Sequence, residues 1–434
     1  MKKIESSIRA WKMRGLSMIG RNLIVETILA SQLTYIATAI NIPDQLVSKI
    51  NTMFLKFIWN RREAVKRNTI IADFDMGGIK IFHVNSFLNS LKMSWIKMVV
   101  NDDVAVWKNI ALYHVRKLGL DTKIFQCNCT LKRMNVECVR IINSLPIFYS
   151  SVMKTWFSVK PVISKHNIIN PGAEIIWNNN TIQLNNKTLF MRDWIKEGFI
   201  RVNDLFDNYG NMLNVQTIQR RMPNNNRTFI DYFIIRNSIP SDWKTNFVTC
   251  NNIPDIMFND LSIHICSTKM FRKVMIESLY IMPTCQNFWV KRFPNFNFKW
   301  DLIWSKLPQC TNEARLISLN WKILHNIYPT KTTLFKMGKE ASNRCDMCNV
   351  IDHIDHFFYS CKKINRIWKT VNHIISCIIK KAISLSDTDV LFGVHTTNIS
   401  NENNILIHHV IAIAKPSIIT SLDVGHISIF LYSP

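Results

Sequence analysis

The sequence has 434 residues, enough for about three domains, and 47% of them are hydrophobic, which excludes an intrinsically disordered chain. Lysine and arginine together number 54 against 30 acidic residues, so the formal net charge is +24. A charge of this size attracts polyanions and leaves nucleic acid or an anionic membrane surface as the partner classes.

The most apolar long stretch, residues 23–42, contains Glu26, Gln32 and Asn41. A membrane-spanning helix needs about 20 predominantly apolar residues, so this stretch predicts a buried helix and no membrane partner. The N-terminus, MKKIESSIRAW, has no apolar core of the signal-peptide type. We therefore expect the 11 cysteines in a reducing compartment, where close-spaced cysteines indicate a metal site rather than disulfides.

Residues 1–110 are predicted to be helical. After Pro43, apolar residues recur at intervals of three and four and predict an amphipathic helix packed on one side: Leu46, Ile50, Met53 and Phe57. A second helix is predicted after Phe82. Between the two lie a basic run at 60–67 and the pair Gly77-Gly78, which marks a backbone position of positive φ or close approach.

Residues 111–290 mix short apolar runs with many asparagines, and prolines break the pattern repeatedly. We expect an α-rich region with short β hairpins and assign no site to it. From residue 291 the chain becomes aromatic and helical again and then reaches a cysteine cluster at 345–361. The predicted fold class is mainly α and multi-domain, with short hairpins and a small zinc-stabilised CCHC module near the C-terminus.

That cysteine cluster is the sharpest motif of the sequence. Cys345, Cys348, His356 and Cys361 follow the spacing Cys-x2-Cys-x7-His-x4-Cys, which places two thiolates in one tight turn and completes a tetrahedron from a second segment. Four protein ligands leave no open position, so the pattern predicts structural Zn²⁺. The alternative interpretation is four unrelated buried residues in a cysteine-rich chain.

Two further metal patterns were weighed. His353 would give the spacing Cys-x2-Cys-x4-His, but that knuckle needs a cysteine at 358, where the chain has Phe358; His356 is therefore the preferred ligand. Cys127, Cys129 and Cys138 have no histidine nearby in the sequence, and they are not predicted to bind metal.

Two basic clusters are candidates for phosphate contact. The zinc-side basic cluster lies on a helix predicted directly after Cys361 and consists of Lys362, Lys363, Arg366 and Lys369. The N-terminal basic cluster surrounds Trp59, which is interpreted as a core residue, and consists of Lys56, Arg61, Arg62, Lys66 and Arg67. For both clusters the alternative is an ordinary solvated face.

Catalytic patterns are weak throughout. A polymerase needs clustered aspartates to hold two Mg²⁺ ions, and the one candidate pair, Asp102-Asp103, follows the apolar end of a predicted helix. We interpret this pair as a helix end and loop. The sequence contains neither a Walker A loop nor a nucleophile with a local base pattern, so we expect no enzyme activity and no small-molecule substrate.

Three segments together resemble the C-terminal part of non-LTR (LINE-type) retrotransposon reverse transcriptases. The first runs from Trp11 to Arg21 and continues to residues 57–59 and 77–78, and the second runs from Glu174 to Gly210. The third begins at Trp321, includes His325 and the cysteine cluster, and ends at Trp368. Asp352 stands where that family commonly has an acidic residue between the second cysteine and the histidine.

The resemblance implies four regions: 1–110, a thumb-like helical region that would follow a palm domain absent from this sequence; 111–290, an α-rich linker region; 291–415, a reverse-transcriptase zinc-binding domain; and 416–434, a divergent tail. It adds Arg14 and Arg21 to the candidate nucleic-acid contacts. It also implies location in the nucleus or in a cytoplasmic ribonucleoprotein, although the sequence itself leaves the location unknown.

The predicted function is that of a nucleic-acid-binding fragment of a reverse transcriptase, which grips template RNA or target DNA without catalysis. Two alternatives stay open: a host-adopted zinc-dependent RNA-binding protein, and a retroelement relic without function.

Overall fold

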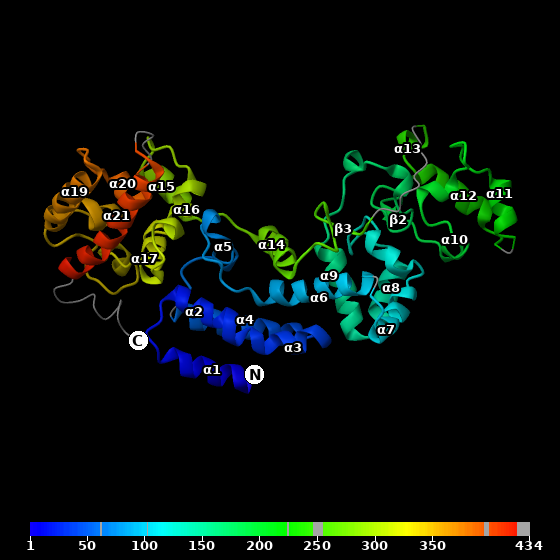
Figure 1. Cartoon of the computed structure of the whole chain (residues 1–434), viewed down its shortest axis with the longest axis horizontal. Helices are drawn as coiled ribbons and strands as arrows, with labels where there is room; N and C mark the ends of the chain where they lie inside the picture. The colour runs from blue at the N-terminus through cyan, green and yellow to red at the C-terminus, as the bar shows by residue number, and fades with distance from the viewer. Residues whose placement is uncertain (61–62, 102, 224, 246–254, 395–398, 423–434) are drawn as a thin grey trace. The chain divides into compact units, whose positions relative to one another are not determined.

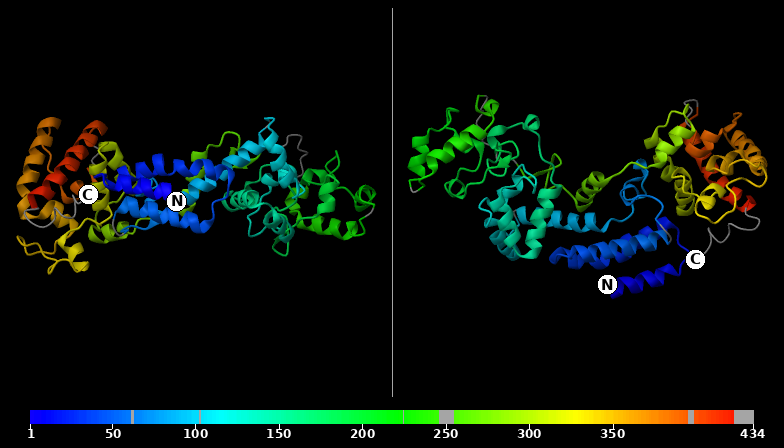
Figure 2. Two further views of the ribbon diagram at one scale, coloured as in Figure 1. Left: turned by 90° about the horizontal axis from the view of Figure 1, so that it is seen from below. Right: turned by 180° about the vertical axis from the view of Figure 1, so that it is seen from behind.

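The computed structural model describes residues 1–60, 63–101, 103–223, 225–245, 255–394 and 399–422 (Figure 1). Helices dominate the described residues, as Figure 2 also shows. Two antiparallel hairpins accompany them: β1 (Gln183–Leu184) pairs with β2 (Lys187–Thr188), and β3 (Met257–Phe258) pairs with β4 (Leu261–Ser262). The predicted fold class, mainly α and multi-domain with short hairpins, is confirmed.

The chain folds into two compact units. Unit 1 contains residues 1–33, 44–84 and the described residues from 276 onward; unit 2 contains residues 34–43 and 85–275. Segments distant in the sequence therefore share unit 1. The four regions implied by the resemblance are consecutive stretches of sequence, whereas each compact unit combines separate stretches. The boundaries of the four regions stay predictions.

Unit 1 begins with α1 (Lys2–Lys12), α2 (Met18–Ile24), a π-helical turn η1 (Val25–Leu29), α4 (Asp44–Trp59), α5 (Arg67–Ile70) and the short η2 (Phe74–Met76). Its later helices are α15 (Cys285–Arg292), α16 (Trp300–Cys310), α17 (Ala314–Leu324), α18 (Lys331–Lys336), α19 (Asn365–Ile379), α20 (Asp387–Phe392) and α21 (Asn401–Leu422). The helix predicted after Pro43 is α4, which buries Val47, Ile50, Phe54 and Phe57.

Unit 2 contains most of α6 (Val84–Val100), which is the helix predicted after Phe82, together with α7 (Val106–Arg116), α8 (Val136–Ser144) and α9 (Ile147–Val159). Shorter helices follow, namely η3 (Asp121–Gln126), η4 (Lys165–Asn167), η5 (Pro171–Ala173), α10 (Arg192–Lys196), η6 (Val202–Leu205), α11 (Val215–Arg221), α12 (Thr228–Ser238) and α13 (Ser241–Thr245). Besides α6, whose first residue belongs to unit 1, two further described helices span the unit boundaries: α3 (Ser31–Ala39) and α14 (Thr268–Leu279).

The apolar stretch at 23–42 is helical but is buried on one side, not throughout. The π-helical turn η1 separates α2 from α3. Val25 and Leu29 are fully buried, whereas Tyr35 is 87% exposed. The predicted buried helix is thus buried along one side of the stretch, while other apolar residues of the stretch are exposed, namely Leu23, Tyr35, Ile36 and Ile40.

The paired glycines of the first resembling segment lie where the N-terminal part of unit 1 contacts α17 and His325, and we call this contact the Gly77 joint. Gly77 has a φ of +82°, and a Cβ on Gly78 would lie 2.0 Å from the Ala72 carbonyl oxygen. The Gly77 carbonyl accepts hydrogen bonds from Trp321 Nε1 at 3.0 Å and His325 Nε2 at 2.8 Å. Both features predicted for this pair, positive φ and close backbone approach, are confirmed. Residues from the first and third resembling segments meet here.

His325 is the buried centre of that joint. Its ring lies between Trp304 and Trp321, with centroid distances of 4.9 and 4.2 Å, and its Nδ1 lies 3.7 Å from Cys285 Sγ. Burial lowers the pKa of His325 to about 4. The carbonyl partner on Nε2 fixes the neutral Nε2–H tautomer.

In unit 2, the residues that resemble the family are packing and turn residues. Trp177 and Trp194 are fully buried, and Trp177 Nε1 donates to the Phe199 carbonyl at 2.7 Å. Asp204 accepts backbone hydrogen bonds from Ile200 and Arg201 at 2.8 and 2.6 Å. Residues within the resembling segment Glu174–Gly210 therefore stabilise that segment by packing and by backbone hydrogen bonds.

One helix in the described part of the chain, α21, is long and apolar enough to cross a membrane, with a mean hydropathy of 1.6 over its most apolar window. This is weak evidence, since a core helix passes the same test. Lys415 on α21 is 3% exposed and donates to Asn320 Oδ1 at 2.7 Å, and burial lowers its pKa to about 7. Ile407, Ile411 and Ile418 are buried beside it, so α21 serves as a core helix of unit 1.

Candidate metal centre and nucleic-acid interface

The four predicted zinc ligands come together in unit 1. The ligand atoms of Cys345, Cys348, His356 and Cys361 all lie within 4.8 Å of one another. Cys361 Sγ lies 3.9 Å from Cys345 Sγ and 4.0 Å from Cys348 Sγ. A tetrahedral ion with Zn–S bonds near 2.3 Å sets sulfur atoms about 3.8 Å apart, and these two sulfur–sulfur distances are close to that value.

The loop with the first two cysteines is a tight backbone turn. The Asn349 N–H donates to the Cys345 carbonyl at 2.9 Å, and the Cys345 N–H donates to the Val350 carbonyl at 2.8 Å. Asn349 has a φ of 50°, a left-handed conformation that asparagine tolerates better than most residues. These bonds turn both thiols to the same side.

His356 begins a π-helical turn, η7 (His356–Ser360), and is 6% exposed. Its Nδ1 lies 3.4 Å from Ser360 Oγ, whereas its buried Nε2 has no hydrogen-bond partner among the described residues. A buried nitrogen without a partner costs about 1–3 kcal/mol, and a metal ion bound at Nε2 would remove that cost. The donor set and this orphaned nitrogen both fit zinc.

His353, the alternative ligand, does not belong to the group of convergent ligand atoms. It is half-buried, and its backbone N–H donates to the Ile351 carbonyl at 3.0 Å. The convergence of ligand atoms therefore favours His356, and its role as the ligand stays a prediction.

The thiols of the group differ electrostatically. The Lys362 backbone N–H donates to Cys348 Sγ at 3.4 Å and lowers the pKa of Cys348. Burial raises the pKa of Cys361 to about 12. A bound divalent cation would favour the thiolate form of both, because metal binding displaces the thiol protons.

Cys127, Cys129 and Cys138 are buried in unit 2, where burial raises the pKa of Cys129 and of Cys138 to about 12. Such thiols are inert. The one convergent group of metal-type ligands in the described residues is that at 345–361. That Cys127, Cys129 and Cys138 bind no metal stays a prediction.

The candidate zinc loop is anchored to the rest of unit 1 through its acidic residues. Asp352 Oδ2 accepts from the Lys331 N–H at 3.1 Å at the start of α18, Asp346 pairs with Lys331 Nζ, and Asp355 pairs with Arg292 at 2.6 Å. Burial raises the pKa of Asp352. The position at which the family commonly has an acid is thus occupied by a helix-capping residue. These anchors were not predicted, because their partners lie far away in the sequence.

Aromatic residues that follow His356 pack the loop onto the core. Phe357 and Phe358 are buried, and both contact Tyr328, with centroid distances of 5.4 and 5.0 Å. Trp368 Nε1 donates to the Phe358 carbonyl at 2.8 Å. The zinc loop and α19 therefore form one packed element.

The residues of the zinc-side basic cluster are exposed. It lies on η8 (Lys362–Ile364) and the first turns of α19, whose buried face carries Ile364, Trp368 and Val371. Residues 341–369 contain three acids, Asp346, Asp352 and Asp355, all engaged as described. In the described part of the chain, no carboxylate pairs with the basic side chains of this range, which are Arg344, Lys362, Lys363, Arg366 and Lys369. Arg344 was not predicted, although it directly precedes Cys345.

The N-terminal basic cluster differs. Lys56, Lys66 and Arg67 are exposed, but Arg67 donates to both carboxylate oxygens of Glu63 at 2.7 Å, and this pair raises the pKa of Arg67. Arg61 and Arg62 lie outside the described residues. Trp59 is half-buried and packs on Trp321 with a centroid distance of 6.2 Å, so it lies at the edge of the core rather than inside it.

The two arginines added by the resemblance differ in their exposure to solvent. Arg14 is exposed, with its guanidinium 4.5 Å from the centre of the Trp11 ring. Arg21 is 8% exposed, and its guanidinium is therefore not on the open surface that a phosphate contact requires. We remove Arg21 from the candidate nucleic-acid residues.

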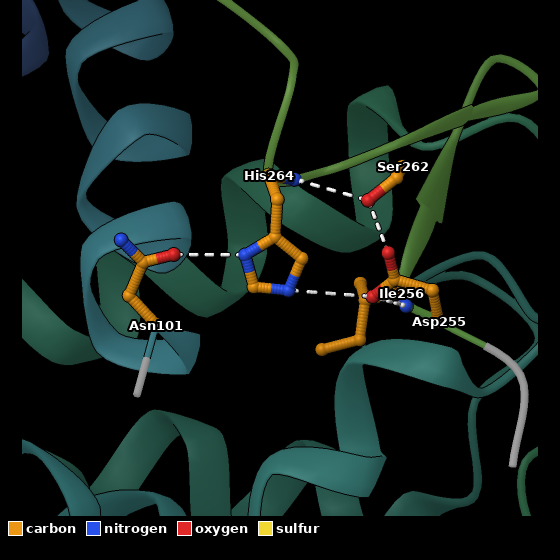
Figure 3. A network of polar contacts seen from close by, with 5 residues as sticks. All are labelled: Asn101, Asp255, Ile256, Ser262 and His264. Carbon is orange, nitrogen blue, oxygen red and sulfur yellow. Dashed lines mark hydrogen bonds and ion pairs between the residues drawn. The ribbon is translucent and has the colours of Figure 1, made fainter. Parts of the chain in front are cut away.

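Polar residues also cluster at the end of α6. α6 ends at Val100, Asp102 lies outside the described residues, and the Asp103 carbonyl accepts from Lys108 Nζ at 2.7 Å. Figure 3 shows a network in which His264 Nδ1 lies 2.8 Å from Asn101 Oδ1 and His264 Nε2 lies 3.4 Å from Asp255 Oδ1.

Ser262 completes this network by donating to Asp255. The carboxylate therefore lies between the hydroxyl and the imidazole, the reverse of the Ser–His–Asp order in which the imidazole takes the serine proton. The network links the end of α6 to the β3–β4 hairpin and has no nucleophile–base geometry.

Comparison with known proteins finds a family match and a related protein. Residues 281–368 match the family described as zinc-binding in reverse transcriptase. Over 461 aligned residues the chain is 20% identical to the Xenopus laevis protein named "Transposon TX1 uncharacterized 149 kDa protein", an alignment that covers 92% of the chain. The chain spans 33% of the length of that relative. The family match begins just before α15 and includes the candidate zinc loop and the start of α19.

Proposed function

We propose that this chain, which is related to the C-terminal region of non-LTR (LINE-type) retrotransposon reverse transcriptases, holds RNA or DNA by its phosphates through a zinc-stabilised module. The module comprises the candidate zinc loop, η8 and α19. Its grip comes from the zinc-side basic cluster together with Arg344.

The observation that carries this proposal is the state of the charges around the loop. Every acid of residues 341–369 is paired or buried, whereas the five basic side chains of the same range have no carboxylate partner in the described part of the chain. Exposed cations that are not already neutralised attract phosphates and release counterions on contact. The helix that presents them begins at a zinc ligand, so the metal would fix their positions.

Zn²⁺ would have a structural role in this arrangement. Cys345, Cys348, His356 and Cys361 would fill its four positions and leave none for water or substrate. Their binding energy would stabilise a loop that has little core of its own. Loss of the metal would then weaken nucleic-acid binding indirectly, by releasing η8 and α19 from the loop.

We further propose that the chain alone does not polymerise DNA. Its one pair of neighbouring aspartates that was weighed as a metal site, Asp102-Asp103, follows the end of α6. A primer-extension assay with Mg²⁺ or Mn²⁺ should therefore show no incorporation. Incorporation that disappears in an Asp102→Ala, Asp103→Ala variant would contradict this.

Binding at several salt concentrations tests the proposed function. Fluorescence anisotropy with labelled RNA and DNA oligonucleotides should give a linear fall of log K with log salt, with a slope of roughly −0.7 per phosphate on single strands and −0.9 on duplexes. Replacing Lys362, Lys363, Arg366 and Lys369 by alanine should weaken binding and flatten the slope. Anionic vesicles serve as the competing polyanion; stronger binding to them than to oligonucleotides would refute the proposal.

A further inference from the structure

Apolar side chains project from the candidate zinc loop into solvent. Met347 is 58% exposed, Val350 is 46% exposed and Ile351 is 43% exposed. We call these three residues the knuckle apolar cluster. They occupy the turn that carries Cys345 and Cys348, where the Cys345–Val350 hydrogen bond and an antiparallel bridge between Arg344 and Ile351 close the backbone. The turn is thus set by backbone bonds, and its apolar side chains are left without a core.

Cations border this cluster. Arg344 directly precedes Cys345, and its Nη1 donates to the Asn349 carbonyl at 2.7 Å, across the same turn. The Lys362 N–H reaches Cys348 Sγ at 3.4 Å, which places the start of the zinc-side basic cluster against the turn. Asp346, the acid within the turn, is already paired with Lys331. The surface is therefore apolar at its centre and positive at its border.

We infer that the knuckle apolar cluster contacts the unpaired bases of a single-stranded nucleic acid while the neighbouring cations hold its phosphates. This inference rests on the proposed function and adds the kind of strand that the zinc module recognises. Bases carry apolar faces and the backbone carries the charge, so a single strand offers both chemistries within one nucleotide.

Neither a duplex nor a typical protein surface matches both the knuckle apolar cluster and the cations that border it as well as a single strand does. In a duplex the base faces are stacked inside the helix, and the grooves offer mainly polar edges. An apolar protein surface would cover Met347, Val350 and Ile351 but would strip water from Arg344 and Lys362 without supplying negative charge. Exposed apolar clusters with polar borders mark interaction sites, and the unpaired cations favour nucleic acid as the partner.

The test compares two oligonucleotides and two variants of the full chain. The probes are a labelled 20-nucleotide oligouridine and a 20-base-pair RNA duplex. The test variant is Met347→Ser, Val350→Ser, Ile351→Ser. The control variant is Leu302→Ser, Ile413→Ser, which removes similarly exposed apolar side chains on α16 and α21. Elemental zinc analysis and circular dichroism establish that each variant is folded and loaded.

The test variant should bind oligouridine about tenfold more weakly than the wild type does, with an unchanged salt slope, because base contact adds affinity without neutralising phosphates. Its duplex affinity should change less than about twofold, and the control variant should match the wild type on both probes.

Equal loss on both probes, a flattened slope or no loss on oligouridine would overturn the inference, and no loss would leave the surface to a protein partner. A wild-type chain that binds neither probe would instead refute the proposed function. If the serine variant fails to fold, Met347→Leu and Ile351→Val should retain wild-type binding while Met347→Gln alone weakens oligouridine binding. Equal binding by all three would overturn the inference.

Discussion

The two basic clusters of unit 1 look alike in the sequence and differ in the structure. Each places several lysines and arginines near a tryptophan, and each was a candidate for phosphate contact. In the N-terminal basic cluster, Arg67 is held by both oxygens of Glu63. In the zinc-side basic cluster no described carboxylate reaches a basic side chain, because Lys331 and Arg292 pair with the nearby acids.

This difference teaches that a count of charges does not establish an interaction surface. The Glu63–Arg67 pair joins residues only four positions apart, with Glu63 in the loop that leads into α5, so the two partners are close together in the sequence itself. The pairs Lys331–Asp346 and Arg292–Asp355 join residues 15 and 63 positions apart. They depend on the tertiary fold and leave one cluster more available to phosphates than the other.

The largest expected effect comes from the metal, which should act on one cluster alone. A Cys345→Ser, Cys348→Ser variant should lose its zinc, because the remaining two ligands cannot close the shell; zinc-finger peptides bind the ion with about 10–16 kcal/mol. Elemental analysis measures the loss, and hydrogen exchange should show α19 opened while α4 stays protected. Cys377→Ser, which removes an exposed cysteine outside the group, is the control.

The same assay distinguishes the two histidines. His356→Ala should release more zinc than His353→Ala, since His356 contributes the buried and otherwise unpartnered nitrogen. The reverse order would make His353 the ligand. Full zinc content in the double-cysteine variant would mean that the metal centre is wrongly assigned.

A smaller effect is expected from pH, which should change the free energy of unfolding of unit 1. Both basic clusters belong to this unit, so both should be affected. The pKa of His325 falls from 6.5 in the unfolded chain to about 4 in the folded one, so the unfolded chain binds the extra proton first as the pH drops. The contribution is fully present above pH 6.5 and is lost as the pH falls towards 4. This amounts to about 3 kcal/mol at most.

The measurement is the free energy of unfolding of wild type and His325→Gln between pH 7.5 and 4.5. The glutamine variant should be less stable at pH 7.5, and its stability should depend less on pH across this window. Parallel curves for the two proteins would show that His325 does not titrate differently on folding, and that the Gly77 joint has another basis.

The smallest expected effect tests the neutralisation of Arg67. Glu63→Gln should free one guanidinium in the N-terminal basic cluster and steepen the salt slope of binding by less than about one unit. Surface pairs of this kind contribute at most about 1 kcal/mol to folding, so thermal stability should hardly change. Weaker binding by Glu63→Gln would run against the view that Glu63 competes with phosphate for Arg67.

Much of this architecture could be predicted from residue patterns, and the exceptions have physical causes. The helix after Pro43, the conformational demand at Gly77-Gly78 and the convergence of the four zinc ligands follow from local spacing. The burial of Arg21 could not be read from its basic neighbourhood, because it depends on the packing of α2 within unit 1. The role of His325 also remained hidden, since its partner Gly77 lies 248 positions away. The resembling segments include both Arg21 and His325, but the resemblance does not explain why either residue is buried.

The knuckle apolar cluster is a case in which apolar residue type gives the wrong expectation about burial. Met347, Val350 and Ile351 are apolar residues that the sequence alone would place in a core, and each is at least 43% exposed. Their turn is too short and too tightly hydrogen-bonded to fold back on a core. Exposure of apolar residues in such a turn is visible only once the backbone is known.

The central claim is that the zinc-side basic cluster, and not the N-terminal one, provides the main grip on nucleic acid. The most direct measurement is the salt slope of oligouridine binding for two variants that each lose three exposed cations: Lys363→Ala, Arg366→Ala, Lys369→Ala, and Lys56→Ala, Lys66→Ala, Arg67→Ala. The first should flatten the slope by about two units, as expected for three lost phosphate contacts on a single strand. The second should flatten it by less than about one unit. Equal slopes for the two variants, or a larger change in the second, would contradict the claim.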